Sequence, residues 1–173
     1  HIVISSGLKQ ELDKYNKVEY FSNIIRPKSL DPAIKITFIT PEQEAQLSVL
    51  GIVPQKSRFT ATQLDVGSGN TKGGYYNANK TFVPVTFPLG TKSFQRLIES
   101  KSKDGINEFI KTAEQLWRDS LRSVVLNEFF IKREVRNRDN MYISGGVVWA
   151  IASLIHPQSS NTNYTEISAQ DIS

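Results

Sequence analysis

The sequence contains no cysteine and only two histidines, His1 and His156, among its 173 residues. The absence of cysteine excludes a disulfide framework and thiolate metal sites. It also fits a reducing compartment, so we expect a cytoplasmic location. The two histidines lie too far apart in sequence to indicate a histidine metal site.

Long apolar runs and a strong net charge are also missing. No apolar run reaches the roughly 20 residues that a membrane-spanning helix needs. The formal net charge is only +4, and no basic stripe is interleaved with aromatic residues. We therefore expect neither a membrane nor a nucleic acid among the partners.

The amino-acid composition is that of an ordinary globular protein, with 39% hydrophobic and 22% charged residues. Its length is that of one domain with a proper core. The chain begins with the strand-like run His1-Ile2-Val3-Ile4 and without an initiator methionine. We therefore expect it to be a fragment of a longer protein.

Hydrophobic spacing and turn signals predict the secondary structure. The expected helices are 8–25, 41–51, 92–100, 105–126 and 147–156. The expected strands are 1–4, 34–38, 59–66, 72–77, 81–87 and 141–143. The remaining segments are a charged connector at 132–138, a polar loop at 157–165 and the beginning of another element at 164–173.

Several residues define the ends and surroundings of these elements. Thr40 and Gln43 form a capping box that predicts the start of the second helix, whereas Pro27 is expected to end the first. Pro84 predicts an edge strand or a bulge. Helix 147–156 is apolar on nearly all sides, so we expect it in the interior.

Three consecutive extended runs with tight connections predict an antiparallel meander. With the later strand and the helices, this gives an α/β fold in which helices flank a mixed sheet. The turn at 67–71 and the glycine pair at 145–146 are expected at one edge of that sheet, where ligands bind in open α/β folds.

The segment 63–76 is the strongest candidate for a binding site. A strand-like run delivers Asp65 to a loop of small residues, namely Gly67, Ser68, Gly69, Asn70 and Thr71. Such a loop brings successive N–H groups close to an anion, and the carboxylate suits hydrated Mg²⁺. It is not a Walker loop, because no Gly-Lys-Ser/Thr opens a helix here. The alternative interpretation is a hairpin with a glycine- and asparagine-rich turn.

Four segments, 40–51, 65–72, 89–94 and 144–146, together resemble the exopolyphosphatase and guanosine pentaphosphate phosphohydrolase (Ppx/GppA phosphatase) family. They are similar, in order and spacing, to its Ser-Gly-x-Glu-Glu-Ala-Arg, Asp-Ile-Gly-Gly-Gly-Ser-Thr-Glu, Met-Gly-x-x-x-Phe and Gly-Gly motifs. This family belongs to the actin-like ATPase superfamily, which has RNase H-like domains. The resemblance implies that residues 1–173 are a second actin-like phosphatase domain, whose N-terminal partner half is absent.

The resemblance also implies an activity. It is hydrolysis of the terminal phosphate of inorganic polyphosphate or guanosine pentaphosphate, assisted by Mg²⁺, in a cleft between the two halves. Glu44 would be the catalytic base and Asp65 would hold the metal. The residues that would bind phosphate are Lys9, Gly67, Ser68, Gly69, Asn70, Thr71, Gly145 and Gly146.

The sequence departs from the family pattern at three positions. Gln46 and Lys9 stand where the family has arginines, and Lys72 replaces a glutamate. Losing a carboxylate and gaining a lysine beside the loop predicts tighter anion binding and a disturbed metal site.

These departures leave alternative functions open. One is a non-catalytic module that binds or senses polyphosphate or a nucleotide. Another is an actin-like ATPase or sugar kinase, against which segment 40–51 argues. A homodimer is also left open as the assembly.

Each candidate residue also has an ordinary structural interpretation. Glu44 near a helix start would stabilise the helix dipole, and Asp65 would cap a turn. Gly145 and Gly146 would permit a tight turn, and Lys9 would be a solvated helix residue.

Overall fold

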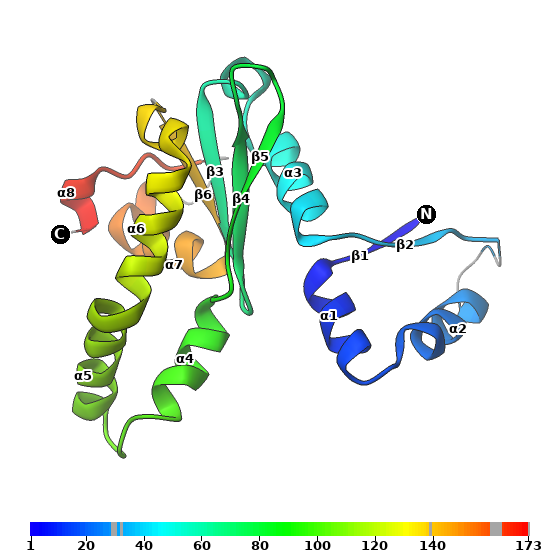
Figure 1. The fold of residues 1–173 in the computed structure, drawn as a ribbon, viewed down its shortest axis with the longest axis horizontal. Coiled ribbons are helices and arrows are strands. Elements are labelled where there is room, and N and C mark those ends of the chain that lie inside the picture. The colour runs from blue at the N-terminus through cyan, green and yellow to red at the C-terminus, as the bar shows by residue number, and fades with distance from the viewer. Residues whose placement is uncertain (29–30, 32, 139, 160–163, 173) are drawn as a thin grey trace.

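The computed structural model describes residues 1–28, 31, 33–138, 140–159 and 164–172. The strands are β1 (Ile2–Ile4), β2 (Ile36–Phe38), β3 (Ala61–Val66), β4 (Thr71–Tyr76), β5 (Phe82–Phe87) and β6 (Asn140–Ser144). The helices are α1 (Ser6–Lys14), α2 (Val18–Lys28), α3 (Pro41–Ile52), α4 (Thr91–Glu99), α5 (Ile106–Leu116), α6 (Arg122–Ile131), α7 (Gly146–Ile155) and α8 (Ala169–Ile172). Figure 1 shows α3 on one side of the main sheet, α6 and α7 on the other, and the first two strands and helices extended to one side as an arm.

The main sheet has the strand order β5-β4-β3-β6. Strands β3, β4 and β5 pair antiparallel, whereas β6 runs parallel to β3. The predicted meander and the predicted α/β mixed sheet are therefore confirmed. Pro84 lies in β5, an edge strand of this sheet, as its missing N–H led us to expect.

Apolar side chains cover both faces of the sheet. On the α6 face the buried residues are Leu64, Tyr75, Val85, Phe87 and Val135, against which Val125 and Phe129 pack. On the α3 face they are Val49, Val53, Ala61 and Tyr76. Because successive residues of a strand point to opposite faces, Asp65 and its cross-strand partner Lys72 lie on the same face as Ala61 and Tyr76, under α3.

Helix α3 begins at the predicted capping box. The Thr40 hydroxyl accepts a hydrogen bond from the Gln43 N–H at 3.2 Å, and the Gln43 side chain accepts one from the Thr40 N–H at 2.9 Å. Ala45 and Val49 anchor the helix to the sheet, with exposed fractions of 0% and 1%. This start and this buried face fix Glu44 in the first turn of the helix, at the end of the sheet where the loop 67–70 lies.

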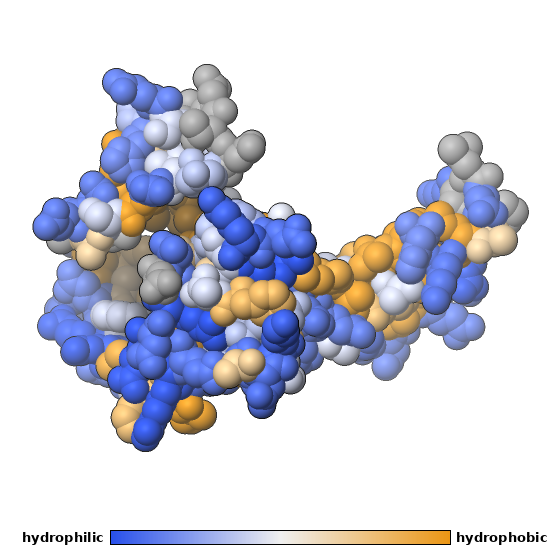
Figure 2. Space-filling view, turned by 90° about the horizontal axis from the view of Figure 1, so that it is seen from above, coloured by the Kyte–Doolittle hydropathy of each residue, from blue (hydrophilic) through white to orange (hydrophobic). Residues whose placement is uncertain are grey.

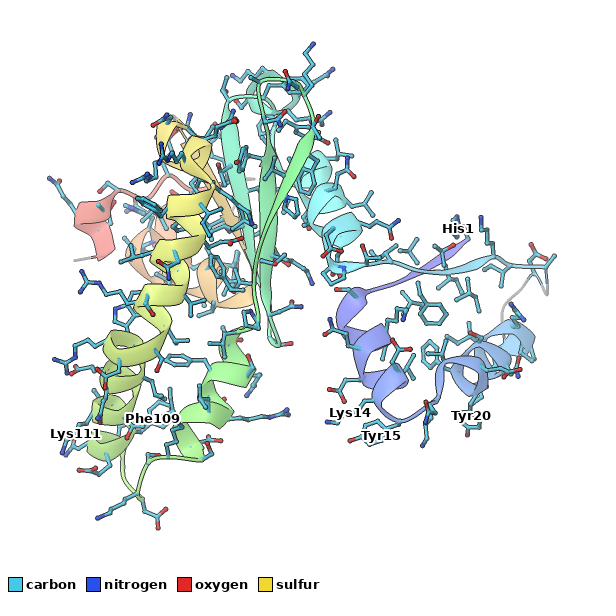
Figure 3. The ribbon with its side chains drawn as sticks, in the orientation of Figure 1. His1, Lys14, Tyr15, Tyr20, Phe109 and Lys111 are labelled. Carbon is cyan, nitrogen blue, oxygen red and sulfur yellow. The ribbon has the colours of Figure 1, made fainter. Side chains whose placement is uncertain are left out.

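The arm is a small parallel two-stranded sheet, β1 with β2, carrying α1 and α2. Figure 2 shows apolar surface running from the body of the protein along this arm. Figure 3 shows His1 beside β2, where its ring hydrogen-bonds the Thr37 hydroxyl at 2.8 Å.

The single helix predicted for 8–25 is wrong. The chain breaks between α1 and α2 at Asn16, whose φ of 55° is the left-handed conformation that asparagine tolerates. Pro27 lies inside the last turn of α2 and not beyond it.

The predicted helix 105–126 is longer than expected. It runs from α5 through a π-helical turn, Trp117–Leu121, into α6. The charged connector after it forms a 3₁₀ helix, Arg133–Asn137, with Val135 buried.

The predicted interior position of helix 147–156 is also wrong. In α7, Trp149 is 67% and Leu154 82% exposed, and in β6 Met141 and Ile143 are nearly half exposed. Within the described residues β6 is the edge strand on this side of the sheet, and no residue of α7 is buried. Part of the predicted loop 157–165 lies outside the described residues. No helix in the described part of the chain combines the length and apolar character needed to span a bilayer.

The packing of α3 on the sheet leads to a stability prediction. Val49→Ala should lower the free energy of unfolding by about 2 kcal/mol, because the lost methyl groups leave a cavity in a closed site. The matched control is Val124→Ala in α6, where the side chain is 47% exposed. This control should lower the free energy of unfolding by less than about 0.5 kcal/mol. Urea unfolding of both variants measures the difference, and equal costs would show that α3 is not packed as described.

Candidate functional site

The loop between β3 and β4 is a closed turn. The Gly67 N–H donates to the Asn70 carbonyl at 3.0 Å. A Cβ at Gly67 would lie 2.9 Å from that same carbonyl, so the turn needs a residue without a side chain there.

The start of α4 holds this loop by its carbonyl groups. The N–H groups of Thr91 and Lys92 donate to the carbonyls of Gly67 and Ser68 at 2.9 and 2.8 Å. The Ser93 hydroxyl donates to the Gly69 carbonyl at 2.8 Å. The loop thus caps the helix N-terminus with its own carbonyls.

The opposite groups of the loop are left for another acceptor. Within the described residues, the N–H groups of Ser68, Gly69 and Asn70 have no hydrogen-bond acceptor. Ser68 and Gly69 are exposed. Successive N–H groups of this kind form a concave donor site for an anion.

Two glycines bring neighbouring segments against the loop. A Cβ at Gly90 would lie 2.3 Å from the Gly67 carbonyl oxygen, and one at Gly145 would lie 2.2 Å from the Val66 carbonyl oxygen. Gly145 also has a φ of 121°. Both positions therefore require glycine, whereas a Cβ at Gly146 would meet no atom within 4 Å.

Glu44 reaches this loop through Lys72. One carboxylate oxygen lies 2.8 Å from the Lys72 ammonium, which is itself 3.4 Å from the Asn70 side-chain oxygen. The other oxygen accepts from the N–H and the hydroxyl of Ser6 at 2.8 and 2.6 Å. The arm, α3 and β4 therefore meet at this one carboxylate.

The surroundings of Glu44 favour its ionised form. Burial alone would raise the pKa of the Glu44 carboxyl. The hydrogen bond from Lys72, those from Ser6 and the charge of Lys72 outweigh burial and hold the pKa below its usual value of 4.5. Glu44 is therefore a carboxylate at neutral pH.

Asp65 is held from the other side of β3. Its register partner in β6 is Ser144, whose hydroxyl donates to the Asp65 carboxylate at 2.8 Å. The Gln63 side-chain amide donates to the same hydroxyl at 3.1 Å. This chain of hydrogen bonds turns Asp65 toward β6, whereas Lys72 turns toward Glu44.

Comparison with known proteins identifies the fold. No family model and no curated protein sequence matches the chain. Among solved structures, an exopolyphosphatase-like protein superposes with a TM-score of 0.63 at 14% identity, over 90% of this chain and 47% of its own. The chain has an exopolyphosphatase-like fold.

Structures of the Ppx/GppA protein from Aquifex aeolicus agree with this result. One superposes with a TM-score of 0.54 at 15% identity, over 96% of this chain and 54% of its own. Another superposes with a TM-score of 0.53 at 17% identity, over 90% of this chain and 46% of its own. The chain thus spans about half the length of the structures that it matches. The predicted α/β fold with a mixed sheet is confirmed, whereas the actin-like superfamily and the second-half assignment of 1–173 stay predictions.

The exopolyphosphatase-like fold gathers most of the predicted site residues at one end of the sheet. Glu44, Asp65, the loop 67–71 and Gly145 all lie there. Thr71 begins β4, and its hydroxyl donates to the Leu89 carbonyl at 2.9 Å. Their roles in binding or catalysis stay predictions.

Lys9 is not brought to the loop. Its ammonium pairs with Asp13, one turn further along α1, and its side chain is 40% exposed. In the described structure it contacts no residue of 67–71. Its surroundings are those of a solvated helix residue, which does not support phosphate binding.

The sequence did not reveal the partners of the two carboxylates. Ser6, which is 1% exposed, carried no signal for this contact, and Ser144 lay in the segment 144–146, which was noted for its glycines. Strand alternation offered a signal for Lys72, because the pairing of β3 with β4 places it opposite Asp65 on the α3 face.

The donor set does not fit a divalent cation beside Glu44. The nearest charged group to that carboxylate is an ammonium, which would repel the metal ion. No group of three acidic or histidine side chains that would hold a metal occurs among the described residues. The Mg²⁺ site at Asp65 therefore stays a prediction, without support from its neighbours.

The glycine pair gives a matched stability test. Gly145→Ala should destabilise the protein by about 2 kcal/mol or more, because it combines backbone strain with a clash against β3. Gly146→Ala, one residue later at the exposed start of α7, should be neutral or slightly stabilising. Urea unfolding distinguishes the two, and similar effects would contradict the described turn.

The pKa of Glu44 predicts a pH dependence. Because this pKa is lowered in the folded state, the carboxylate contributes stability above the unfolded value of 4.5, and that stability is lost as pH falls through the lower folded value. At pH 7 the free energy of unfolding of wild type should exceed that of Glu44→Gln by about 1–2 kcal/mol. This difference in unfolding free energy should become smaller below pH 4.5.

Unfolding free energies of both proteins from pH 7 to pH 3 measure this gap. The control is Glu42→Gln, at an exposed position in the same turn, with an expected effect under about 0.5 kcal/mol. A gap between wild type and Glu44→Gln that widened with falling pH would show that the ion pair does not stabilise the fold.

Proposed function

We propose that this chain is part of a phosphoanhydride hydrolase that releases the terminal phosphate of inorganic polyphosphate or guanosine pentaphosphate. The loop 67–71 binds the terminal phosphate, and Glu44 is the general base. The site is one wall of a cleft whose other wall is an N-terminal actin-like half of the same protein.

The observation that carries this proposal is the meeting of a donor loop and a carboxylate at one end of the sheet. The loop has three N–H groups without protein acceptors in the described structure. Glu44 is joined to the same loop through Lys72, which contacts Asn70. A loop of N–H donors or a carboxylate alone is common in proteins. Transfer of a phosphoryl group to water requires both, one to bind the phosphate and one to accept the proton.

The chemistry needs little from the protein beyond placement and charge. In the hydrolysis step, a water oxygen attacks the terminal phosphorus while the phosphoanhydride P–O bond breaks. The leaving chain keeps the electron pair of that bond, and the carboxylate of Glu44 accepts a proton from the water. The loop N–H groups stabilise the charge on the phosphate oxygens.

The hydrolase proposal predicts the effect of removing the base. Glu44→Gln should lower phosphate release from polyphosphate by about 10²-fold or more, because amide nitrogen and oxygen do not accept the water proton. Binding should change little, since the loop is untouched. Phosphate release and calorimetric titration by the intact protein measure the two effects separately, with Glu42→Gln as the control. Unchanged release in Glu44→Gln would remove Glu44 from the mechanism.

A second candidate is a binding or sensing module without turnover, and the ion pair of Glu44 favours it. Both carboxylate oxygens already accept hydrogen bonds, one from Lys72 and the other from Ser6. Tight binding of polyphosphate without phosphate release by wild type would select this candidate. Turnover of ATP in place of polyphosphate would instead point to the actin-like ATPase or sugar kinase alternative.

A further inference from the structure

Lys72 occupies an unusual position for a lysine. It is 7% exposed, in the second position of β4, and the strand register places it opposite Asp65. Most lysines are exposed, so a buried one requires partners. Glu44 supplies a full counter-charge at 2.8 Å, and the Asn70 side chain supplies a second acceptor at 3.4 Å.

The ammonium of Lys72 is also held at the phosphate-binding loop. Its contact with Asn70 reaches a loop residue whose own N–H has no acceptor among the described residues. A lysine ammonium carries three N–H donors, and two have acceptors among the described residues. No acceptor for the third is found among the described residues.

The charges around this ammonium are two carboxylates, Glu44 from α3 and Asp65 from β3. Lys72 balances Glu44 in the ion pair. Asp65 forms no ion pair with Lys72 in the described structure and accepts a hydrogen bond from Ser144 in β6 instead. The ammonium is thus a cation held at the loop by Glu44 and Asn70.

We propose that Lys72 supplies the cation of this site, so that the loop 67–71 binds a phosphate chain without a divalent metal ion. Glu44 and Asn70 hold the ammonium at the loop, and a phosphate oxygen accepts its third N–H. This inference rests on the proposed binding of a phosphate chain and holds for both the hydrolase and the binding module.

The direct test is calorimetric titration of the intact protein with linear polyphosphate in EDTA and in MgCl₂ at equal ionic strength. Equal ionic strength matters because salt screens these charges. We expect dissociation constants within about 3-fold of each other in the two buffers. Lys72→Met should weaken binding in EDTA by about 10-fold or more, since a charge-assisted hydrogen bond to phosphate is lost.

The matched control is Lys80→Met. Lys80 lies in the turn after β4, at the other end of that strand, so the variant changes the net charge equally and leaves the loop intact. It should change binding by less than about 3-fold. Similar losses in the two variants would overturn the assignment of Lys72.

Lys72→Met leaves the partly buried Glu44 without its counter-charge, so a second variant protects the test against misfolding. Glu44→Gln/Lys72→Met removes both charges of the pair, which proteins tolerate better than the loss of one. It should show the same loss of binding in EDTA as Lys72→Met. Glu44→Gln alone keeps the ammonium, so it should bind polyphosphate in EDTA about 10-fold or more tightly than the double variant.

Failure of this inference differs from failure of the proposed function. Binding that requires MgCl₂ and is unaffected by Lys72→Met would overturn the role of Lys72 but keep the phosphate site. No binding of polyphosphate in either buffer would overturn both. A further variant, Lys72→Glu, should bind only in MgCl₂, and metal-free binding by that variant would also contradict the inference.

Discussion

The ion pair between Glu44 and Lys72 is the interaction on which this end of the molecule depends. It joins α3 to β4 at 2.8 Å, and Ser6 of the arm completes the surroundings of the same carboxylate. Three segments that are far apart in sequence therefore converge on one side chain. Because that side chain is also the candidate base, the arrangement that stabilises the fold here also fixes the chemistry available to the site.

The loop 67–70 owes its form to a second constraint, the use of its carbonyls as caps for α4. Those carbonyls accept from Thr91, Lys92 and Ser93, and the N–H groups of Ser68, Gly69 and Asn70 have no acceptor among the described residues. Glycine at position 90 is what permits this approach, because a Cβ would lie 2.3 Å from a loop carbonyl. The shape of the loop is thus fixed by helix capping and by glycine, before any ligand is considered.

Much of this arrangement could be predicted from the sequence because local signals carry it. The capping box of Thr40 and Gln43 gave the start of α3, and the glycine-rich turns gave the meander. The arm was predicted less well, since one left-handed residue, Asn16, divides a helix that hydrophobic spacing alone makes continuous. The position of α7 was missed for a different reason: an apolar helix needs elements to cover it, and hydrophobicity does not show whether they are there.

The sequence predicted which residues lie at the site better than it predicted their hydrogen-bond and ion-pair partners. Glu44, Asp65 and the loop followed from motif spacing, whereas their partners Ser6 and Ser144 come from other elements and carry no local signal. The neutralisation of Glu44 by Lys72 required the register of β4 against β3 and the distance to α3 together.

The most direct test of the account is an amide NMR titration of the intact protein with tripolyphosphate. The account predicts that the largest shifts of the backbone N–H signals fall on Ser68, Gly69 and Asn70, whose N–H groups have no acceptor in the described structure. Shifts that left these three signals unchanged and gathered elsewhere would contradict it.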